Sequence, residues 1–286
     1  MEILRSGLLQ RAFVEIVIVG AACGALGVWV LHLRHAYAAE SLAHAMLPGL
    51  VIAALVGAPL VLGAVGGVLV AAALIALAAR DTRVGPEVAV GVTVTTAFGL
   101  GALLALAPDV PARLGELLFG DLLGTSRTDL AVAAGLAALV AAALAGGHRQ
   151  LVATVFDPAA APSLGVRPGR VELASLALLG VATVAAVQGL GNLLVFALLV
   201  APAAAAIRLG DSVRAQLLLG PALGAGAGAL GLVVSTELDL AAGASVALAA
   251  VALYGLALLV RPPAPSRSAT SGRSPVDALG PGGGQA

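Results

Sequence analysis

The 286-residue sequence is 60% hydrophobic, only 10% charged, and has a formal net charge of zero. Soluble domains are about a quarter charged, so this chain lacks the polar residues that a water-facing surface needs, and lipid is the alternative solvent. All 15 basic residues are Arg, which excludes a P-loop with its phosphate-binding Lys, so any ATP would be hydrolysed by another chain. The neutral charge gives no indication of a nucleic-acid partner.

Gly, Pro and charged clusters divide the sequence into apolar blocks, each near the roughly 20 residues that cross a bilayer. The predicted fold is therefore all-α, a polytopic bundle of transmembrane helices with eight or nine spans. In chain order the predicted spans are 12–33, 40–57, 59–79, 87–107, 129–146, 171–187, 192–208, 214–234 and 241–260. The blocks at 40–57 and 171–187 are short enough to be tilted, broken or parts of longer helices.

The arginines predict how the bundle is oriented. Threading the nine spans puts eleven arginines on one side and four on the other. Because basic residues concentrate in cytoplasmic loops, we expect a multi-pass protein of the cell (plasma or inner) membrane with a cytoplasmic C-terminus. Residues 262–286 are rich in Pro, Gly and Ser. We therefore expect a transmembrane domain over 1–261 and a disordered cytoplasmic tail over 262–286.

Small residues recur at spacings that let helix backbones approach closely in lipid. They are Gly20 with Gly24, Gly63 with Gly67, and Gly220, Gly224 and Gly228. Tight packing within one bundle is the expected role, ahead of a dedicated dimer face. Pro202 and Pro221 lie inside predicted spans, and they would kink or break helices where a transport pathway could run.

The second predicted span differs from the others because it begins with two ionisable groups. Glu40 and His44 are four residues apart, so on a helix they share one face, about a turn apart. A carboxylate and an imidazole offer ligands suited to Zn²⁺, Mn²⁺ or Fe²⁺. The alternative is an interfacial pair that meets water, with His44 about one turn from the cytoplasmic edge. Two ligands do not complete a site, and the other polar candidates cannot be assigned. They are Gln188, Asn192, Glu237 and Asp239.

The sequence contains no catalytic arrangement of the Ser–His–Asp, His-Glu-x-x-His or paired-Cys type, so we do not expect an enzyme.

The longest predicted connection on the cytoplasmic side, 147–170, contains Asp157 directly before Pro158. This pair fits a helix N-cap followed by Pro at the first helical position, and Gly165 fits the stop. We expect a short helix under the membrane, which is either a connector or a lever that an ATPase subunit pushes.

At these residues the chain resembles the metal-type ABC permeases, the ABC-3 family of zinc, manganese and iron importers. The family signature G-D-x-L-S-H-A-x-L-P-G is similar to Ala39-Glu40-Ser41-Leu42-Ala43-His44-Ala45-Met46-Leu47-Pro48-Gly49. Further matches, in family order, are Leu117–Leu123, then Phe156, Asp157, Pro158, Ala161 and Gly165, then Pro202 in a small-residue span, then the acidic turn at Asp239.

The resemblance implies a type II-like ABC importer permease, homodimeric or paired, with the metal path along the subunit interface. A separate ATP-binding subunit would energise it, a solute-binding protein outside the membrane would deliver the ion, and no cofactor would be bound permanently. Glu40 and His44 stand where the family's metal ligands stand. The segment from Asp157 to Gly165 stands where the coupling helix docks on the ATPase. Glu40 replaces the commoner Asp, which leaves the preferred metal open.

Other functions remain open at this point. A permease of the same architecture could carry a chelated metal or another small solute, with His44 shaping a cavity. A stand-alone secondary transporter driven by an ion gradient would need no ATPase, and the 147–170 helix would then be only a linker. A non-transporting scaffold would leave Glu40 and His44 unexplained.

Overall fold

The computed structural model describes residues 7–79, 85–106, 126–190 and 192–261, and every regular element in these ranges is a helix. The elements are α1 (Gly7–His32), α2 (Ala36–Ala45), α3 (Leu47–Val56), α4 (Leu60–Ala78), α5 (Pro86–Ala105), α7 (Arg127–Phe156), the 3₁₀ helix η3 (Ala161–Leu164), α8 (Pro168–Leu190), α9 (Asn192–Leu209), α10 (Val213–Leu238) and α11 (Ala242–Val260). The motif Leu117–Leu123 and the tail 262–286 lie outside the described residues.

Each of the nine predicted spans coincides with a helix or a helix pair. Eight helical segments are long and apolar enough to cross a membrane, and the apolar part of α9 forms a shorter ninth. The prediction of an all-α bundle with eight or nine spans is therefore confirmed.

The second span is one apolar segment, Ala36–Val56, made of two helices. The α-helical pattern is interrupted at Met46, between α2 and α3. Pro48 lies in the first turn of α3, where its missing N–H removes no helical hydrogen bond. Gly57 ends α3 with a left-handed φ of 68°, which glycine adopts without steric cost. The predicted block 40–57 is therefore both longer and broken.

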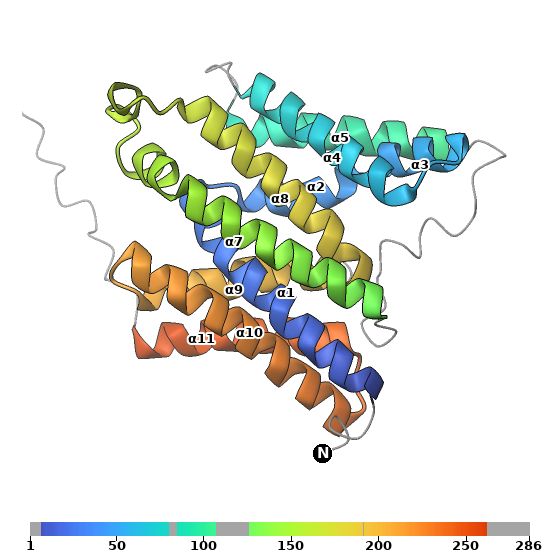
Figure 1. Cartoon of the computed structure of the whole chain (residues 1–286), viewed down its shortest axis with the longest axis vertical. Helices are drawn as coiled ribbons and strands as arrows, with labels where there is room; N and C mark the ends of the chain where they lie inside the picture. The colour runs from blue at the N-terminus through green and yellow to red at the C-terminus, as the bar shows by residue number, and fades with distance from the viewer. Residues whose placement is uncertain (1–6, 80–84, 107–125, 191, 262–286) are drawn as a thin grey trace, which may run out of the picture.

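Two groups of helices meet across α2 and α8. Figure 1 shows α3, α4 and α5 on one side and α1, α7, α9, α10 and α11 on the other. Helix α2 packs mainly on α5 and α8, while α8 packs on α4 and α7. Helix α1 packs on α7, α9 and α10. The N-terminal half of the second span thus lies at the junction between the two groups.

The glycines of α1 and α10 allow the backbones of these two helices to approach each other closely. A Cβ on Gly220 would lie 2.6 Å from the carbonyl oxygen of Gly24, and one on Gly20 would lie 2.5 Å from that of Gly224. The pairing of Gly20 with Gly224 and Gly24 with Gly220 shows that the two helices run antiparallel. The prediction that these glycines serve packing within one bundle is confirmed.

One end of the bundle, called here the arginine-rich end, carries Arg34, Arg149, Arg170, Arg208 and Arg261. Interactions between helix ends bring these residues to the same end of the bundle. His32 at the end of α1 contacts Gln216 at the start of α10, and Trp29, Leu151 and Val171 share one buried cluster. Nη1 of Arg261 donates a 3.3 Å hydrogen bond to the backbone carbonyl oxygen of Arg208. The grouping of these arginines is as predicted, and the side of the membrane that this end faces stays a prediction.

Helix α7 is longer than predicted. It contains 30 residues, about 45 Å at 1.5 Å per residue, which exceeds the bilayer core. The polar run at His148–Gln150 suggested a loop, but this part of α7 packs on α1: the rings of His148 and Trp29 lie 5.8 Å apart, and Leu151 is buried. The predicted connection 147–170 is therefore wrong, and only residues 157–167 join α7 to α8.

Candidate metal site

The candidate ligands lie on one exposed face of α2. Glu40 and His44 are both exposed, together with Tyr37 one turn earlier. The residues between them are buried against α5 and α8: Ala38, Ala39, Ser41, Leu42 and Ala43. This alternation follows the helical repeat of 3.6 residues. The predicted shared face of Glu40 and His44 is thus present in the fold.

His44 lies further from the start of its helix than the sequence suggested. Helix α2 begins at Ala36, four residues before the predicted start, so His44 lies about 12 Å along the helix from that residue. The rings of His44 and Phe98 are 5.8 Å apart and nearly perpendicular. Phe98 lies about 18 Å from the start of α5 at Pro86, near the middle of that 20-residue helix. Counted from the start of its helix, His44 thus lies about two turns in, where the predicted start of the span placed it about one turn in, and its depth in the membrane stays a prediction.

The surface around the two ligands is apolar and lateral. Val88, Val92 and Phe98 of the neighbouring α5 are each about half exposed or more. A carboxylate and an imidazole are therefore presented sideways from the bundle, on a segment that is long and apolar enough to cross a membrane. Within the described ranges, no three His, Cys, Asp or Glu side chains are grouped closely enough to hold a metal ion. One copy of the chain offers two ligands here.

The remaining polar candidates do not join this site. Glu237 and Asp239 lie at the C-terminal end of α10, and the N-terminal end of α10 contacts the arginine-rich end through Gln216. They are therefore at the opposite end of the bundle from the start of α2. Gln188 and Asn192 have described backbones only. The sequence was correct to leave these residues unassigned.

The segment after α7 forms the predicted short turn of helix. The backbone N–H of Ala160 donates a 3.0 Å hydrogen bond to Oδ1 of Asp157, but Asp157 is the residue that ends α7, and η3 begins only at Ala161 with Ala160 before it. The expectation of a helix N-cap at Asp157 with Pro158 in the first helical position is therefore wrong. The chain turns from Pro158, enters η3 at the buried Ala161, and stops at Gly165 with a φ of 75°. The helix is shorter than expected and is of the 3₁₀ type.

Pro202 does not break its helix. Helix α9 continues from Asn192 to Leu209 with Pro202 inside it. The neighbouring turn of α9 packs closely on α1, because a Cβ added to Gly27 would collide with the carbonyl oxygen of Leu199 and lie 2.8 Å from the Cβ of Ala203. The expectation of a broken helix is wrong at this position, and a role for Pro202 in the pathway stays a prediction.

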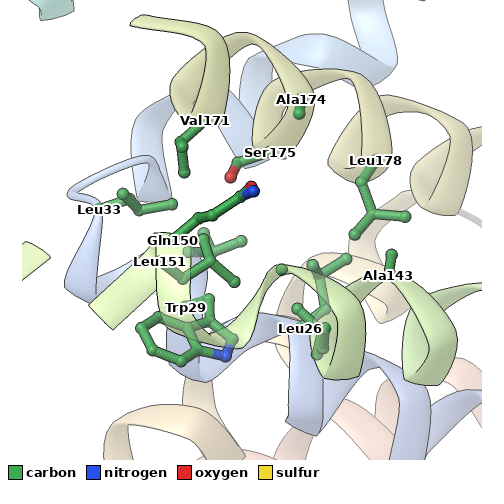
Figure 2. Close-up of a pocket in the computed structure, with 13 residues that line it drawn as sticks. Leu26, Trp29, Leu33, Ala143, Gln150, Leu151, Val171, Ala174, Ser175 and Leu178 are labelled. Atoms are coloured by element: carbon green, nitrogen blue, oxygen red, sulfur yellow. The ribbon is translucent and has the colours of Figure 1, made fainter. Parts of the chain in front are cut away.

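Sequence reasoning missed a second internal feature, a cavity of about 100 Å³ between α1, α7 and α8. Figure 2 shows its mainly apolar wall, with Trp29, Leu151, Val171 and Leu178, and with Gln150 and Ser175 projecting toward one another. No carboxylate or imidazole lines it. The sequence did not reveal this cavity, because His148 and Gln150 suggested a loop where α7 in fact continues. It offers no metal ligands and lies apart from Glu40 and His44.

Comparison with known proteins gives consistent results over nearly the whole chain. The manganese transport system membrane protein MntC of Halalkalibacterium halodurans is 33% identical over 262 residues, covering 91% of this chain and 90% of that protein. The manganese import system permease protein ScaB of Streptococcus gordonii is 28% identical over 254 residues, covering 89% and 91%.

A solved structure agrees with these relatives. The structure of PsaBC from Streptococcus pneumoniae in complex with Fab superposes with a TM-score of 0.79 at 27% identity, covering 91% of this chain and 94% of that one. Residues 5–261 match the ABC 3 transport family. The resemblance seen in the signature around Glu40 and His44 therefore extends through every described span, and the chain is a multi-pass membrane protein that belongs to the ABC 3 transport family.

Proposed function

We propose that this chain is the membrane-spanning permease of an ABC importer that moves a divalent metal ion, Mn²⁺ first among Mn²⁺, Fe²⁺ and Zn²⁺, into the cell by alternating access. The observation that carries the proposal is the exposure of Glu40 and His44 on one lateral face of α2. The names of the manganese permeases that match over about nine-tenths of the chain support the cargo.

This face requires a covering partner. An ionisable side chain at membrane depth is costly when it faces lipid, and such groups therefore face a cavity or another protein surface. The apolar residues of α5 beside them, Val88, Val92 and Phe98, suit contact with a second permease subunit. A two-fold pairing through this face would bring two copies of Glu40 and two of His44 to one axis. The metal path would then follow the subunit interface.

Such a paired site suits a transported ion. Two carboxylates and two imidazoles supply the oxygen and nitrogen ligands that Mn²⁺, Fe²⁺ and Zn²⁺ accept. Glu40 is one methylene longer than the Asp that is common in the family, so its carboxylate reaches further toward the axis. An ion held between two exposed side chains on separate subunits can be released when the subunits move. Transport requires this moderate binding, because a very tight site would not release its ion.

The energy for transport would come from a separate ATP-binding subunit, because the sequence contains no Lys for a P-loop. The turn from Asp157 to Gly165 is the proposed contact for that subunit. Two large apolar side chains flank the turn, Phe156 at 55% exposure and Leu164 at 69% exposure. Exposed apolar side chains at the end of a span are suited to docking on another protein. The arginine-rich end would then face the cytoplasm, and a solute-binding protein would deliver the ion on the other side.

The test is metal uptake by cells that express the ATP-binding subunit and the solute-binding protein with each permease variant. We expect Glu40→Gln and His44→Ala each to lower Mn²⁺ uptake about tenfold or more, since even residues that only orient a ligand have effects of about 10- to 100-fold. Glu237→Gln, at the far end of α10, is the matched carboxylate control and should transport normally. Equal accumulation of Mn²⁺, Fe²⁺ and Zn²⁺ by all variants at matched expression would contradict direct ligation and favour a chelated solute.

A further inference from the structure

The corner between α1 and α2 holds one side chain that contacts the start of α8. Helix α1 ends with Arg34 in the left-handed region, at a φ of 60°, and the backbone N–H of His35 donates a 2.8 Å hydrogen bond to the carbonyl oxygen of Val30. This is a Schellman ending, with Arg34 in place of the usual glycine. The carbonyl oxygen of His35 then accepts a 2.9 Å hydrogen bond from the N–H of Ala39, in the first turn of α2. His35 is therefore fixed to the helix that carries the candidate metal ligands.

The imidazole of His35 contacts Glu172 of α8. Its Nε2 lies 3.6 Å from Oε1 of Glu172, an ion pair when the imidazole is protonated, and only 11% of the His35 side chain is exposed. Nδ1 of the same ring is buried and has no hydrogen-bond partner in the described part of the chain. Glu172 is therefore the polar side chain that stabilises this ring. Among the described residues, their contact is the one ion pair that joins α8 to the start of α2.

Glu172 lies in the part of α8 that directly follows the turn from Asp157 to Gly165, the proposed contact for the ATP-binding subunit. Only two residues separate this turn from Pro168, the first residue of α8. One of the two, Val166, packs against the buried cluster that contains Val171. Val171 belongs to the first turn of α8 and directly precedes Glu172. A movement of the turn would therefore displace the start of α8, and Glu172 with it.

We propose that Glu172 and His35 are positioning residues that connect the turn after α7 to α2, so that movement of the ATP-binding subunit reorients the metal ligands on α2. The inference rests on the proposed function and gives a route for the regulation of its metal site. Neither residue would touch the ion. The pair borders a cavity of about 350 Å³ between α2, α4, α5 and α8, and this space leaves room for the start of α2 to move. Because α2 packs mainly on α5 and α8, a shift of α8 would act on it directly.

The test measures Mn²⁺ uptake per ATP hydrolysed, with the full-length chain, its ATP-binding subunit and its solute-binding protein reconstituted in proteoliposomes. We expect Glu172→Gln and His35→Gln each to lower this ratio about threefold or more, an effect typical of residues that couple two sites without touching either ligand. The double variant should lose no more than either single variant, because both remove the same contact. His35→Arg keeps a cation beside Glu172 and should retain most of the ratio. Glu87→Gln removes another carboxylate that lines the same cavity and should couple as wild type.

Amide hydrogen exchange gives a second measurement, which does not depend on transport. A non-hydrolysable ATP analogue bound to the ATP-binding subunit should change the exchange rates of α2 in the wild-type complex but not in the Glu172→Gln complex. A contact that only supports the fold would instead lower the thermal midpoint of unfolding and leave uptake per ATP unchanged. That result, or an equal exchange response in both complexes, would overturn the proposal.

The same assay separates this inference from the proposed function. If Glu40→Gln lowers uptake while Glu172→Gln and His35→Gln keep the wild-type ratio, the link is overturned and the permease function stands. If Glu40→Gln transports normally, the proposed function fails and this inference fails with it. Should Glu172→Gln not fold, Glu172→Asp keeps the charge but shortens the side chain by one methylene, which lengthens the 3.6 Å contact. It should lower uptake per ATP about twofold or more, and a wild-type ratio would overturn the proposal equally.

Discussion

The imidazole of His44 lies edge-on to the ring of Phe98, with centroids 5.8 Å apart and planes at 83°. The two residues come from α2 and α5, which run parallel here, since Tyr37 lies beside Gly91 and His44 beside Phe98. Both rings are exposed on the same lateral face. The contact therefore orients the imidazole within a single subunit, before a partner covers the face.

Replacing Phe98 by Ala should raise the KM for Mn²⁺ uptake about three- to tenfold, because an edge-to-face ring contact contributes about 0.5–1.5 kcal/mol to the orientation of His44. The maximal rate should change less. Leu103→Ala removes an exposed apolar side chain from the same helix, away from His44, and serves as the control. The orientation argument fails if Phe98→Ala and Leu103→Ala have the same KM in radioactive ⁵⁴Mn²⁺ uptake.

The positions of the spans were predictable because each needs a long apolar block, and composition alone reveals such blocks. The ends of the spans were not predictable from the sequence. Glu40 suggested a helix start and His148 a helix end, since polar residues usually mark the membrane boundary. In the fold α2 begins at Ala36, and α7 continues to Phe156. Contacts with other helices decide these ends, as between His148 and Trp29, and such contacts are absent from local sequence.

The sequence predicted that Glu40 and His44 form a pair on one helix face, but not that this face is exposed on the side of the bundle. The four-residue spacing of Glu40 and His44 places them on one face of any helix. Whether that face is inside the bundle depends on which neighbours cover Leu42 and Ala43, the buried side of α2. The proposal that a second subunit covers this face rests on that tertiary packing. The expected break of the helix at Pro202 was wrong, because helix α9 remains continuous around it.

Gly24→Ala should destabilise the bundle and lower its thermal midpoint by several degrees. A Cβ at Gly24 would collide with the backbone carbonyl of Gly220, and overpacking of this kind costs about 1–3 kcal/mol. The control is Gly226→Ala on α10, where an added Cβ meets no atom within 4 Å. A thermal unfolding measurement in detergent should show no loss for Gly226→Ala. Equal midpoints for the two variants would rule out the close α1–α10 approach.

Gln216 joins the ends of three helices, and Gln216→Met should loosen them. Its Nε2 donates to the carbonyl of Gly210, 3.0 Å away, so its Oε1 accepts from Nε2–H of His32 at 2.7 Å. Methionine keeps the length but leaves both partners unsatisfied, at a cost of about 1–3 kcal/mol. Gln150→Met makes the same change at an exposed position of α7. Only Gln216→Met should unfold at lower temperature and exchange amide hydrogens faster at the start of α10.

Comparing Asp157→Ala with Asp157→Asn should separate two effects. One is the loss of the hydrogen bond that orders the turn after α7, and the other is the loss of the negative charge at Asp157. Asn keeps a side-chain oxygen that can accept the hydrogen bond from Ala160 N–H, whereas Ala removes it. Loss of such a hydrogen bond costs about 1 kcal/mol, which lowers the population of the ordered turn about fivefold relative to its alternatives. Asp157→Ala should therefore reduce Mn²⁺ uptake per ATP hydrolysed, while Asp157→Asn transports close to wild type.

The same measurement distinguishes a coupling role from mere structural support. If the turn transmits the ATPase movement, Asp157→Ala remains inserted and assembled with the ATP-binding subunit but hydrolyses ATP without matching uptake. Gly165→Arg should act in the same direction, because a φ of 75° strains any residue with a Cβ. Full ATP-driven uptake in both variants would remove the turn from the coupling path. Equal uptake loss in Asp157→Asn and Asp157→Ala would instead assign the effect to the carboxylate charge at the subunit contact.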